Sequence, residues 1–228
     1  MKTTIFTFLS STISLFALCL LSTHCRSIPY VGSTAQTPFM KQNDKLVVGG
    51  DVVAAYEGRH GSIEPYAIAG GRLHLAAQPV EHLVVAGSAT LTRESTEAEA
   101  MAGFNAEGFE LYAGYGKSLV RGSSYSKVYQ YDSDIDRLFF QGGILKSFGI
   151  FDLGGYSRIA FTGGSRTEVA TGAYRSARFG QPVLEAGPLL RYHINPVFID
   201  LKAAVIVGLK EIYAPPWVFS AGMGFQLF

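Results

Sequence analysis

The chain has 228 residues, of which 48% are hydrophobic and only 16% are charged, and its formal net charge is +1. A water-facing surface usually carries about 25–35% charged residues, which argues against an ordinary soluble globule. The near-neutral charge gives no electrostatic case for binding nucleic acid, and the many aromatic residues exclude disorder. After the first 25 residues the sequence has no run of about 20 apolar residues, so we exclude a helical membrane protein.

The amino-terminal end has the layout of a secretory signal. Lys2 precedes an apolar stretch that continues to Leu21, and a polar segment follows. Cys25 comes directly after this stretch, at the position where bacterial lipoprotein processing attaches lipid. We therefore expect residues 1–24 to be a lipoprotein signal peptide.

The sequence around the expected lipid site departs from the usual pattern. A lipobox has Leu three residues before the Cys and a small residue immediately before it, whereas here Leu21 lies one place too early and His24 precedes Cys25. The alternative is ordinary cleavage with Cys25 as an incidental residue. We expect a covalent diacylglycerol or acyl lipid on Cys25, no other cofactor, and an extended tether over residues 25–43.

From residue 44 onward almost every segment alternates between apolar and polar or small residues, which is typical of strands with two unlike faces. In 109–116 the odd positions are apolar or aromatic. The pattern predicts strands at about 44–57, 64–77, 82–94, 96–105, 108–119, 135–147, 150–163, 182–194, 197–210 and 216–228.

The segment 96–105 is the weakest of these strands because its residue types favour helix. Outer-membrane barrels have an even strand number, with short turns at one end and longer loops at the other. With ten strands the short connections, at 78–81, 106–107, 148–149 and 195–196, all fall on one side. The long ones, 120–134 and 164–181, fall on the other, so the connection lengths favour ten strands.

Proline and the aromatic residues give two further expectations. Pro188 lies in the middle of a predicted strand, where we expect a bulge or a local disturbance. Aromatic residues gather near predicted strand ends, as in a membrane-interface belt. They are Phe148, Phe151, Tyr192, Phe198, Tyr213, Trp217 and Phe228.

The polar face of the strands carries a nearly balanced set of charges. We expect it to form a luminal polar network in a narrow, largely filled barrel, with the apolar face turned toward lipid. Turned outward, the same face would make a thinly charged and glycine-rich soluble surface. The residues are Arg72, Glu99, Glu110, Gln141, Asp152, Arg158, Glu185, Arg191, Asp200 and Lys202.

Catalytic and metal-binding arrangements are weakly represented. His74 and His82 fall where both could face the lumen, and Ser88 shares a face with His82 several residues along the strand. A nucleophile needs its base within hydrogen-bond reach, and two histidines lack the further ligands of a metal site. We predict no enzymatic activity, no catalytic residues and no metal.

The predicted outer loops are the candidate contact surface for an extracellular ligand. Loop 120–134 carries Arg121, Tyr125 and Tyr129, and loop 164–181 carries Tyr174 and Arg175. Tyr and Arg are frequent at binding hot spots, although a loop of this composition is also compatible with plain solvated loop.

Several of these residues together resemble an uncharacterised family of Gram-negative outer-membrane β-barrel lipoproteins. They are Cys25, Tyr30, Thr37-Pro38-Phe39, the strand 109–116 and Leu184-Glu185-Ala186-Gly187-Pro188. Gly32 stands where the family often has Pro, and two residues separate Glu185 from Pro188. The resemblance implies a lipoprotein and a barrel, and it implies no activity.

We therefore expect an all-β fold, a ten-stranded antiparallel up-and-down transmembrane barrel over residues 44–228, in the cell outer membrane with both termini periplasmic. Its expected partners are outer-membrane lipid and the lipoprotein-processing and barrel-assembly machinery, and not nucleic acid. The expected role is structural or surface interaction. Alternatives left open are a narrow channel or small-ligand transport barrel, and a lipid-tethered soluble periplasmic barrel.

Overall fold

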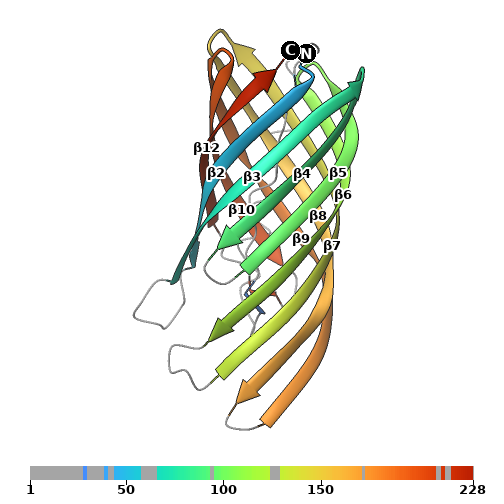
Figure 1. Ribbon diagram of the computed structural model, residues 1–228, viewed down its shortest axis with the longest axis vertical. Helices are drawn as coiled ribbons and strands as arrows, with labels where there is room; N and C mark the ends of the chain where they lie inside the picture. Colours follow the sequence, from blue (N-terminus) through green and yellow to red (C-terminus); the bar gives the residue numbers. More distant parts are fainter. Residues whose placement is uncertain are drawn as a thin grey trace, which may run out of the picture.

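The computed structural model describes residues 28–29, 39–40, 44–57, 66–92, 95–123, 129–170, 173–208, 212–213 and 217–227. Within these ranges the chain forms a closed antiparallel barrel of ten strands, as predicted (Figure 1). The predictions for the signal peptide 1–24, for Cys25 and for Phe228 lie outside the described residues. No helix among the described residues is long and apolar enough to cross a membrane.

Ten strands make the barrel, and each of the ten predicted strands is present. They are β2 Leu46–Glu57, β3 Tyr66–Val80, β4 Leu83–Thr92, β5 Ser95–Ala106, β6 Phe109–Ser123, β7 Tyr129–Phe148, β8 Phe151–Ala170, β9 Ala173–Ile194, β10 Val197–Gly208 and β12 Trp217–Leu227. Pairing of β12 with β2 closes the ring. Two short strands, β1 Ile28–Pro29 and β11 Ile212–Tyr213, form a separate parallel pair.

The alternation in the sequence determines which face of each strand is inside. On β6 the side chains of Phe109, Leu111 and Tyr115 are 43%, 52% and 50% exposed, while Glu110 and Tyr112 are 0% and 1% exposed. Successive side chains of a strand point to opposite faces, so Phe109, Leu111 and Tyr115 lie outside, and the alternate positions, polar and apolar, lie inside. The segment 96–105 obeys the same rule as β5, with its alanines outside and Glu99 buried.

The two predicted long loops are wrong over most of their length. Four strands, β6 to β9, continue far beyond the others as paired ribbon (Figure 1). Only 124–128 and 171–172 remain between them. The backbone pairing continues through segments rich in polar residues, for example where Arg121 lies opposite Asp132. Polar residues occupy both odd and even positions of these segments, so the period-two hydrophobic signal is missing from the sequence.

The four short connections lie together at the other end of the barrel, where β2 begins and β12 ends (Figure 1). The predicted connection 78–81 is shorter than expected, because β3 continues through Pro79 to Val80. The β3–β4 register shifts between Ala77 and Val80, so an irregularity lies at this strand end.

The local disturbance predicted at Pro188 is present, but it is a gap in the pairing and not a bulge that shifts the register. Pairing of β9 with β10 stays in one register on both sides, from Leu189 opposite Lys202 to Ala186 opposite Val205, and only the pairs between them are missing. Proline lacks the backbone N–H that donates a hydrogen bond to the neighbouring strand, so a local gap in the strand pairing is expected. On its other side Pro188 is paired with Gly155 of β8.

Candidate functional site: the luminal polar network

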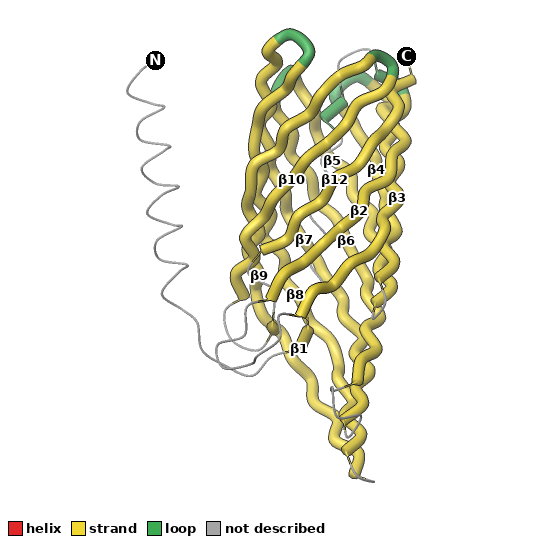
Figure 2. Tube along the Cα trace, turned by 90° about the vertical axis from the view of Figure 1, so that its left-hand side faces the viewer, coloured by secondary structure: helices red, strands yellow, loops and turns green. Residues whose placement is uncertain are grey.

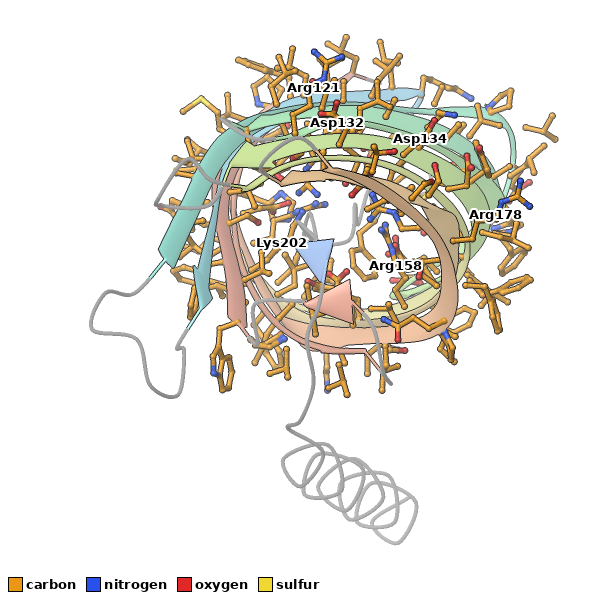
Figure 3. All side chains as sticks on the ribbon, turned by 90° about the horizontal axis from the view of Figure 1, so that it is seen from below. Arg121, Asp132, Asp134, Arg158, Arg178 and Lys202 are labelled. Carbon is orange, nitrogen blue, oxygen red and sulfur yellow. The ribbon has the colours of Figure 1, made fainter. Side chains whose placement is uncertain are left out.

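The inside of the barrel is filled by charged and polar side chains from every strand. Figure 3, a view along the barrel, shows Arg158 and Lys202 pointing into the ring, while Arg121 and Arg178 point outward. All ten residues predicted for the network are no more than 6% exposed. They lie at alternate positions of β3, β5, β6, β7, β8, β9 and β10.

Arg158 of β8 is the centre of one half of the network. Its guanidinium donates to both carboxylate oxygens of Glu99, at 2.8 and 3.2 Å, from across the barrel. It also donates to Gln141 Oε1, at 3.2 and 3.0 Å, on the neighbouring strand. The Phe139 ring lies under the guanidinium, 4.2 Å from its centroid, so this cation is held by charge, hydrogen bonds and a π face together.

Residues that the sequence analysis did not include extend this half. Arg137 pairs with Glu97 and lies 3.7 Å from Glu99, so Glu99 is shared by two arginines. Ser118 donates to Glu97 at 3.1 Å. Charge alternates from side chain to side chain, which offsets the desolvation that would oppose burying any one of them alone.

Glu185 of β9 adds a tyrosine to the network. It lies directly opposite Arg158 on β8, and its Oε1 accepts a hydrogen bond from the Tyr156 hydroxyl at 3.0 Å. Tyr156 is 5% exposed and was not predicted as part of the network.

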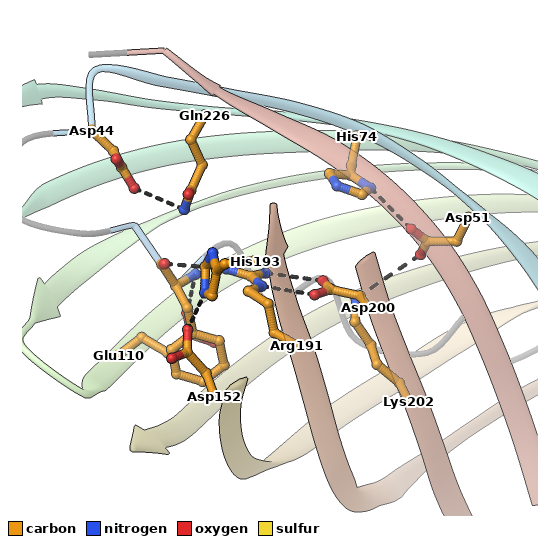
Figure 4. Close-up of polar contacts among 11 residues, drawn as sticks. Asp44, Asp51, His74, Glu110, Asp152, Arg191, His193, Asp200, Lys202 and Gln226 are labelled. Atoms are coloured by element: carbon orange, nitrogen blue, oxygen red, sulfur yellow. Dashed lines mark hydrogen bonds and ion pairs between the residues drawn. The ribbon is translucent and has the colours of Figure 1, made fainter. Parts of the chain in front are cut away.

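Arg191 and Asp200 form the second half, nearer to the short turns (Figure 4). The two residues are direct cross-strand partners on β9 and β10. Their side chains make a bidentate pair, with Nε to Oδ1 at 2.7 Å and Nη2 to Oδ2 at 2.9 Å. The guanidinium also stacks on the ring of Phe198, 4.2 Å from its centroid.

Lys202 and Asp51 continue this half across the seam that closes the barrel. The Lys202 ammonium lies 3.9 Å from Asp200 Oδ2 and 4.0 Å from Asp51 Oδ2 (Figure 4). Asp51 on β2, which was not predicted, also pairs with Arg72 and has His74 Nδ1 at 3.4 Å. The ion pairs therefore run without a break from β9 through β10 and β2 to β3.

Gln141 connects the two halves. Its Nε2 donates to Glu110 Oε1 at 3.4 Å while its Oε1 accepts from Arg158. Asp152 is paired with His193 at the short-turn end. Every residue of the predicted network thus has a named polar partner within the described part of the lumen.

One predicted belt aromatic lies inside instead. Phe198 was expected at the membrane interface with its neighbours on the chain, but it is 1% exposed and packs under Arg191. Its outward neighbour on the strand is Ile199, which is 37% exposed. Position along the alternation, rather than nearness to a strand end, decides the face.

The histidines do not assemble a nucleophilic site with Ser88. His82 lies in a turn with a φ of 64°, and its side chain is 44% exposed, so it does not face the lumen. The register places Ser88 of β4 opposite His74 of β3 instead. The His74 ring, however, is turned toward β2, with Asp51 at Nδ1 and its Nε2 where a Cβ on Gly49 would be. No group of His, Cys, Asp and Glu in the described residues is arranged to hold a metal ion.

The outward face changes character along β6 and β7. Up to Tyr115 and Leu138 the exposed residues are mostly apolar, and beyond them Lys117 lies 3.1 Å from Asp134 and 3.8 Å from Asp136, with the exposed Leu119 next to them. These ion pairs are about half exposed, and such surface pairs contribute little stability. From here on, the outward face of β6 and β7 mixes charged and apolar side chains.

Comparison with known proteins gives the fold and no family. No protein-family model matches the sequence, and no curated protein matches it. Among solved structures, the outer membrane protease OmpT from Escherichia coli has a TM-score of 0.52 and 11% identity over 80% of this chain and 94% of its own. The translocator domain of the autotransporter NalP from Neisseria meningitidis has a TM-score of 0.51 and 12% identity, over 83% and 91%. At such low identities these outer-membrane barrels show a common architecture only.

Proposed function

We propose that this chain is an outer-membrane β-barrel lipoprotein with a structural or surface-interaction role, whose lumen is filled rather than conducting. Among the described residues, thirty large apolar side chains are exposed, while the four largest fully buried side chains are all arginines on the inside. This arrangement is unfavourable in water. It is favourable for a barrel surrounded by hydrocarbon, where outward residues are apolar and inward ones polar. It is the single observation that carries the proposal.

The expected lipid on Cys25 remains part of this proposal. It is supported by the sequence pattern of the amino-terminal end, and it adds an anchor to a barrel that the apolar belt already holds in the membrane. A soluble periplasmic barrel tethered by lipid would not need the belt.

The extensions of β6 to β9 are the proposed contact surface. Their outward residues beyond the belt include both signs of charge, such as Arg121, Asp132 and Arg178, all well exposed. Paired strands hold these side chains in a fixed arrangement, which lowers the entropy lost on binding relative to a free loop. The short-turn end offers no comparable projection and is proposed to face the periplasm.

Current recordings in planar bilayers test the filled lumen against the narrow-channel alternative. The refolded full-length protein is expected to show no resolved openings, because the Arg158–Glu99 pair crosses the bore and the other buried charged side chains fill the space around it. Reproducible openings that disappear in Arg158→Trp, but persist in the surface variant Arg121→Trp, would show a conducting path along the network. Such openings would contradict a filled lumen and support the narrow channel.

Membrane placement has a separate test. Cys25→Ser removes the only proposed lipid site, so extraction of that variant from membranes distinguishes the belt from the lipid as anchor. We expect it to stay in the membrane until detergent is added. Release into buffer would support the soluble tethered barrel instead.

A further inference from the structure

The chain that precedes β2 lies inside the barrel. Phe39 and Met40 are 5% and 3% exposed, although neither belongs to a barrel strand. Glu110 Oε2 accepts a hydrogen bond from the Phe39 backbone N–H at 3.1 Å, and Arg191 Nη1 donates to the Phe39 carbonyl at 3.3 Å. Asn105 Nδ2 donates to the carbonyl of Met40. Three side chains of the barrel wall therefore bind this backbone.

The wall is also shaped to receive the side chains. A Cβ added at Gly143 would lie 2.6 Å from the Phe39 ring, so the absence of a side chain there makes room for it. Met40 joins the apolar cluster of the lumen with Val47, Val84 and others. Phe39 has a φ of 37°, which a non-glycine residue rarely adopts and which its surroundings must hold in place.

This luminal position is close to the short-turn end. Glu110 is the second residue of β6, and Asn105 is the last but one of β5, on either side of a short turn. Further along the chain the buried Asp44 accepts from Gln226 at 3.1 Å, and the Lys45 N–H donates to the Leu227 carbonyl. The chain thus leaves the lumen at this end to begin β2.

The earlier described segment lies at the opposite end. β1, Ile28–Pro29, pairs with β11, which belongs to the connection between β10 and β12 and hence to the end of the long strands. Figure 2 places β1 below the ends of β2, β10 and β12, and Figure 3 shows β1 (pale blue) and β11 (salmon) lying across the mouth of the ring. The described residues 28–29 and 44 therefore lie at opposite ends of the barrel.

The length of chain between the two anchor points is sufficient for this path. Ten residue steps separate Pro29 from Phe39, and they span up to about 35 Å when extended. The 12 residues of β10, tilted by about 40°, rise about 30 Å along the barrel axis. Ten residue steps are therefore long enough to connect the mouth with the site of Phe39.

We propose that the amino-terminal segment is a luminal strap that runs through the barrel and emerges at the mouth of the long strands. Cys25 precedes Ile28 by three residues, which span at most about 11 Å. The strap thus displays Cys25, and any lipid attached to it, at the outer surface rather than in the periplasm. This placement rests on the proposed function, which assigns the long-strand end to the cell exterior, and it replaces the expectation of a periplasmic amino terminus.

Closure of the barrel explains how the strap becomes enclosed without being threaded. The ring is completed by β2 and β12, the first and last barrel strands, which pair over eleven positions. A segment already seated against Glu110 and Arg191 on the open sheet is surrounded when this seam closes. After closure, the strap is in contact with the barrel wall on all sides.

Thiol labelling on intact cells tests the exposed end. Ser27→Cys is the reporter, Arg121→Cys marks the outer surface, and Glu107→Cys marks a short turn; the wild type measures labelling of Cys25 itself. With a membrane-impermeant maleimide, Ser27→Cys is expected to react as fully as Arg121→Cys, and Glu107→Cys only after lysis. Reaction of Ser27→Cys only after lysis, with Arg121→Cys still reactive on intact cells, overturns the surface display.

A disulfide test of the strap is independent of the membrane. Ile28 and Ile212 are register partners, and neighbouring strands lie about 4.8 Å apart, within the range of a disulfide. The pair Ile28→Cys with Ile212→Cys should cross-link on oxidation, whereas Ile28→Cys with Glu107→Cys at the other end should not. Failure of the first pair, or cross-linking of the second, contradicts the strap. Cross-linking of the first pair with Arg121→Cys unreactive on intact cells would support the strap and contradict the proposed function alone.

Discussion

At the scale of single residues, the buried charged side chains of the lumen are stabilised by ion pairs and hydrogen bonds to one another. A buried ion is expensive, and its partner offsets that cost only when the geometry is good. Arg158 has bidentate contact with Glu99 and two bonds to Gln141, and Arg191 has bidentate contact with Asp200. Removing one partner of a buried pair should therefore destabilise the barrel more than replacing both partners by apolar residues.

The first prediction concerns Arg158. Arg158→Met should destabilise the barrel by about 3–5 kcal/mol, because Glu99 and Gln141 lose their donor inside the lumen. Urea unfolding of the refolded protein in detergent measures the change. The matched variant Arg121→Met, on the exposed extension, should lie within about 0.5 kcal/mol of wild type. Equal losses in the two variants would contradict a buried network.

The second prediction uses two adjacent glycines of β7. Gly143→Ala should cost about 1–3 kcal/mol by overpacking, because its Cβ would meet the Phe39 ring at 2.6 Å and Glu110 at 3.0 Å. Gly142→Ala is the control, since its nearest neighbours lie 3.8 Å away. The same urea titration compares them, and equal stability of the two variants would show that Phe39 does not occupy the lumen.

At the scale of elements, period two predicted the strands wherever one face was apolar, including 96–105, whose residue types favour helix. The same pattern failed to predict the extensions of β6 to β9, where polar residues occupy both alternate sets of positions. These extensions were predicted as loops because pairing between strands, which the sequence of one strand does not reveal, maintains them. Pro188 also shows the limit. The sequence indicates a disturbance there but not whether register shifts, and the neighbouring strands keep it in register.

The third prediction treats the extension as separable from the barrel. Ser165 pairs with Arg178 across β8 and β9, so residues 165–178 can be replaced by an Asn-Gly turn of the type that closes tight hairpins. The shortened protein should still refold, because the belt and the luminal network lie below the cut. Heat-modifiable mobility on gels measures this. A variant that migrates as unfolded without heating would show that the extension is needed for the fold.

At the scale of the whole molecule, the outer face of the barrel is predominantly apolar, and the charged network lies inside together with a smaller apolar cluster. The sequence predicted the apolar outer face and ten of the luminal residues. Asp51, Glu97 and Arg137 were not predicted, although they lie at inward positions of the alternation and are buried. The sequence could not have revealed Phe39 in the lumen, since enclosure of a segment outside the sheet leaves no periodic signal.

The most direct test of the central claim, an outer face in contact with lipid, uses the only tryptophan of the chain. Trp217 begins β12, faces outward and is 41% exposed. In vesicles whose lipid chains are brominated near the headgroup, its fluorescence should be strongly quenched relative to vesicles of unbrominated lipid, and acrylamide in the water should quench it weakly. Fluorescence that is unaffected by brominated lipid and readily quenched by acrylamide would contradict a membrane-embedded barrel.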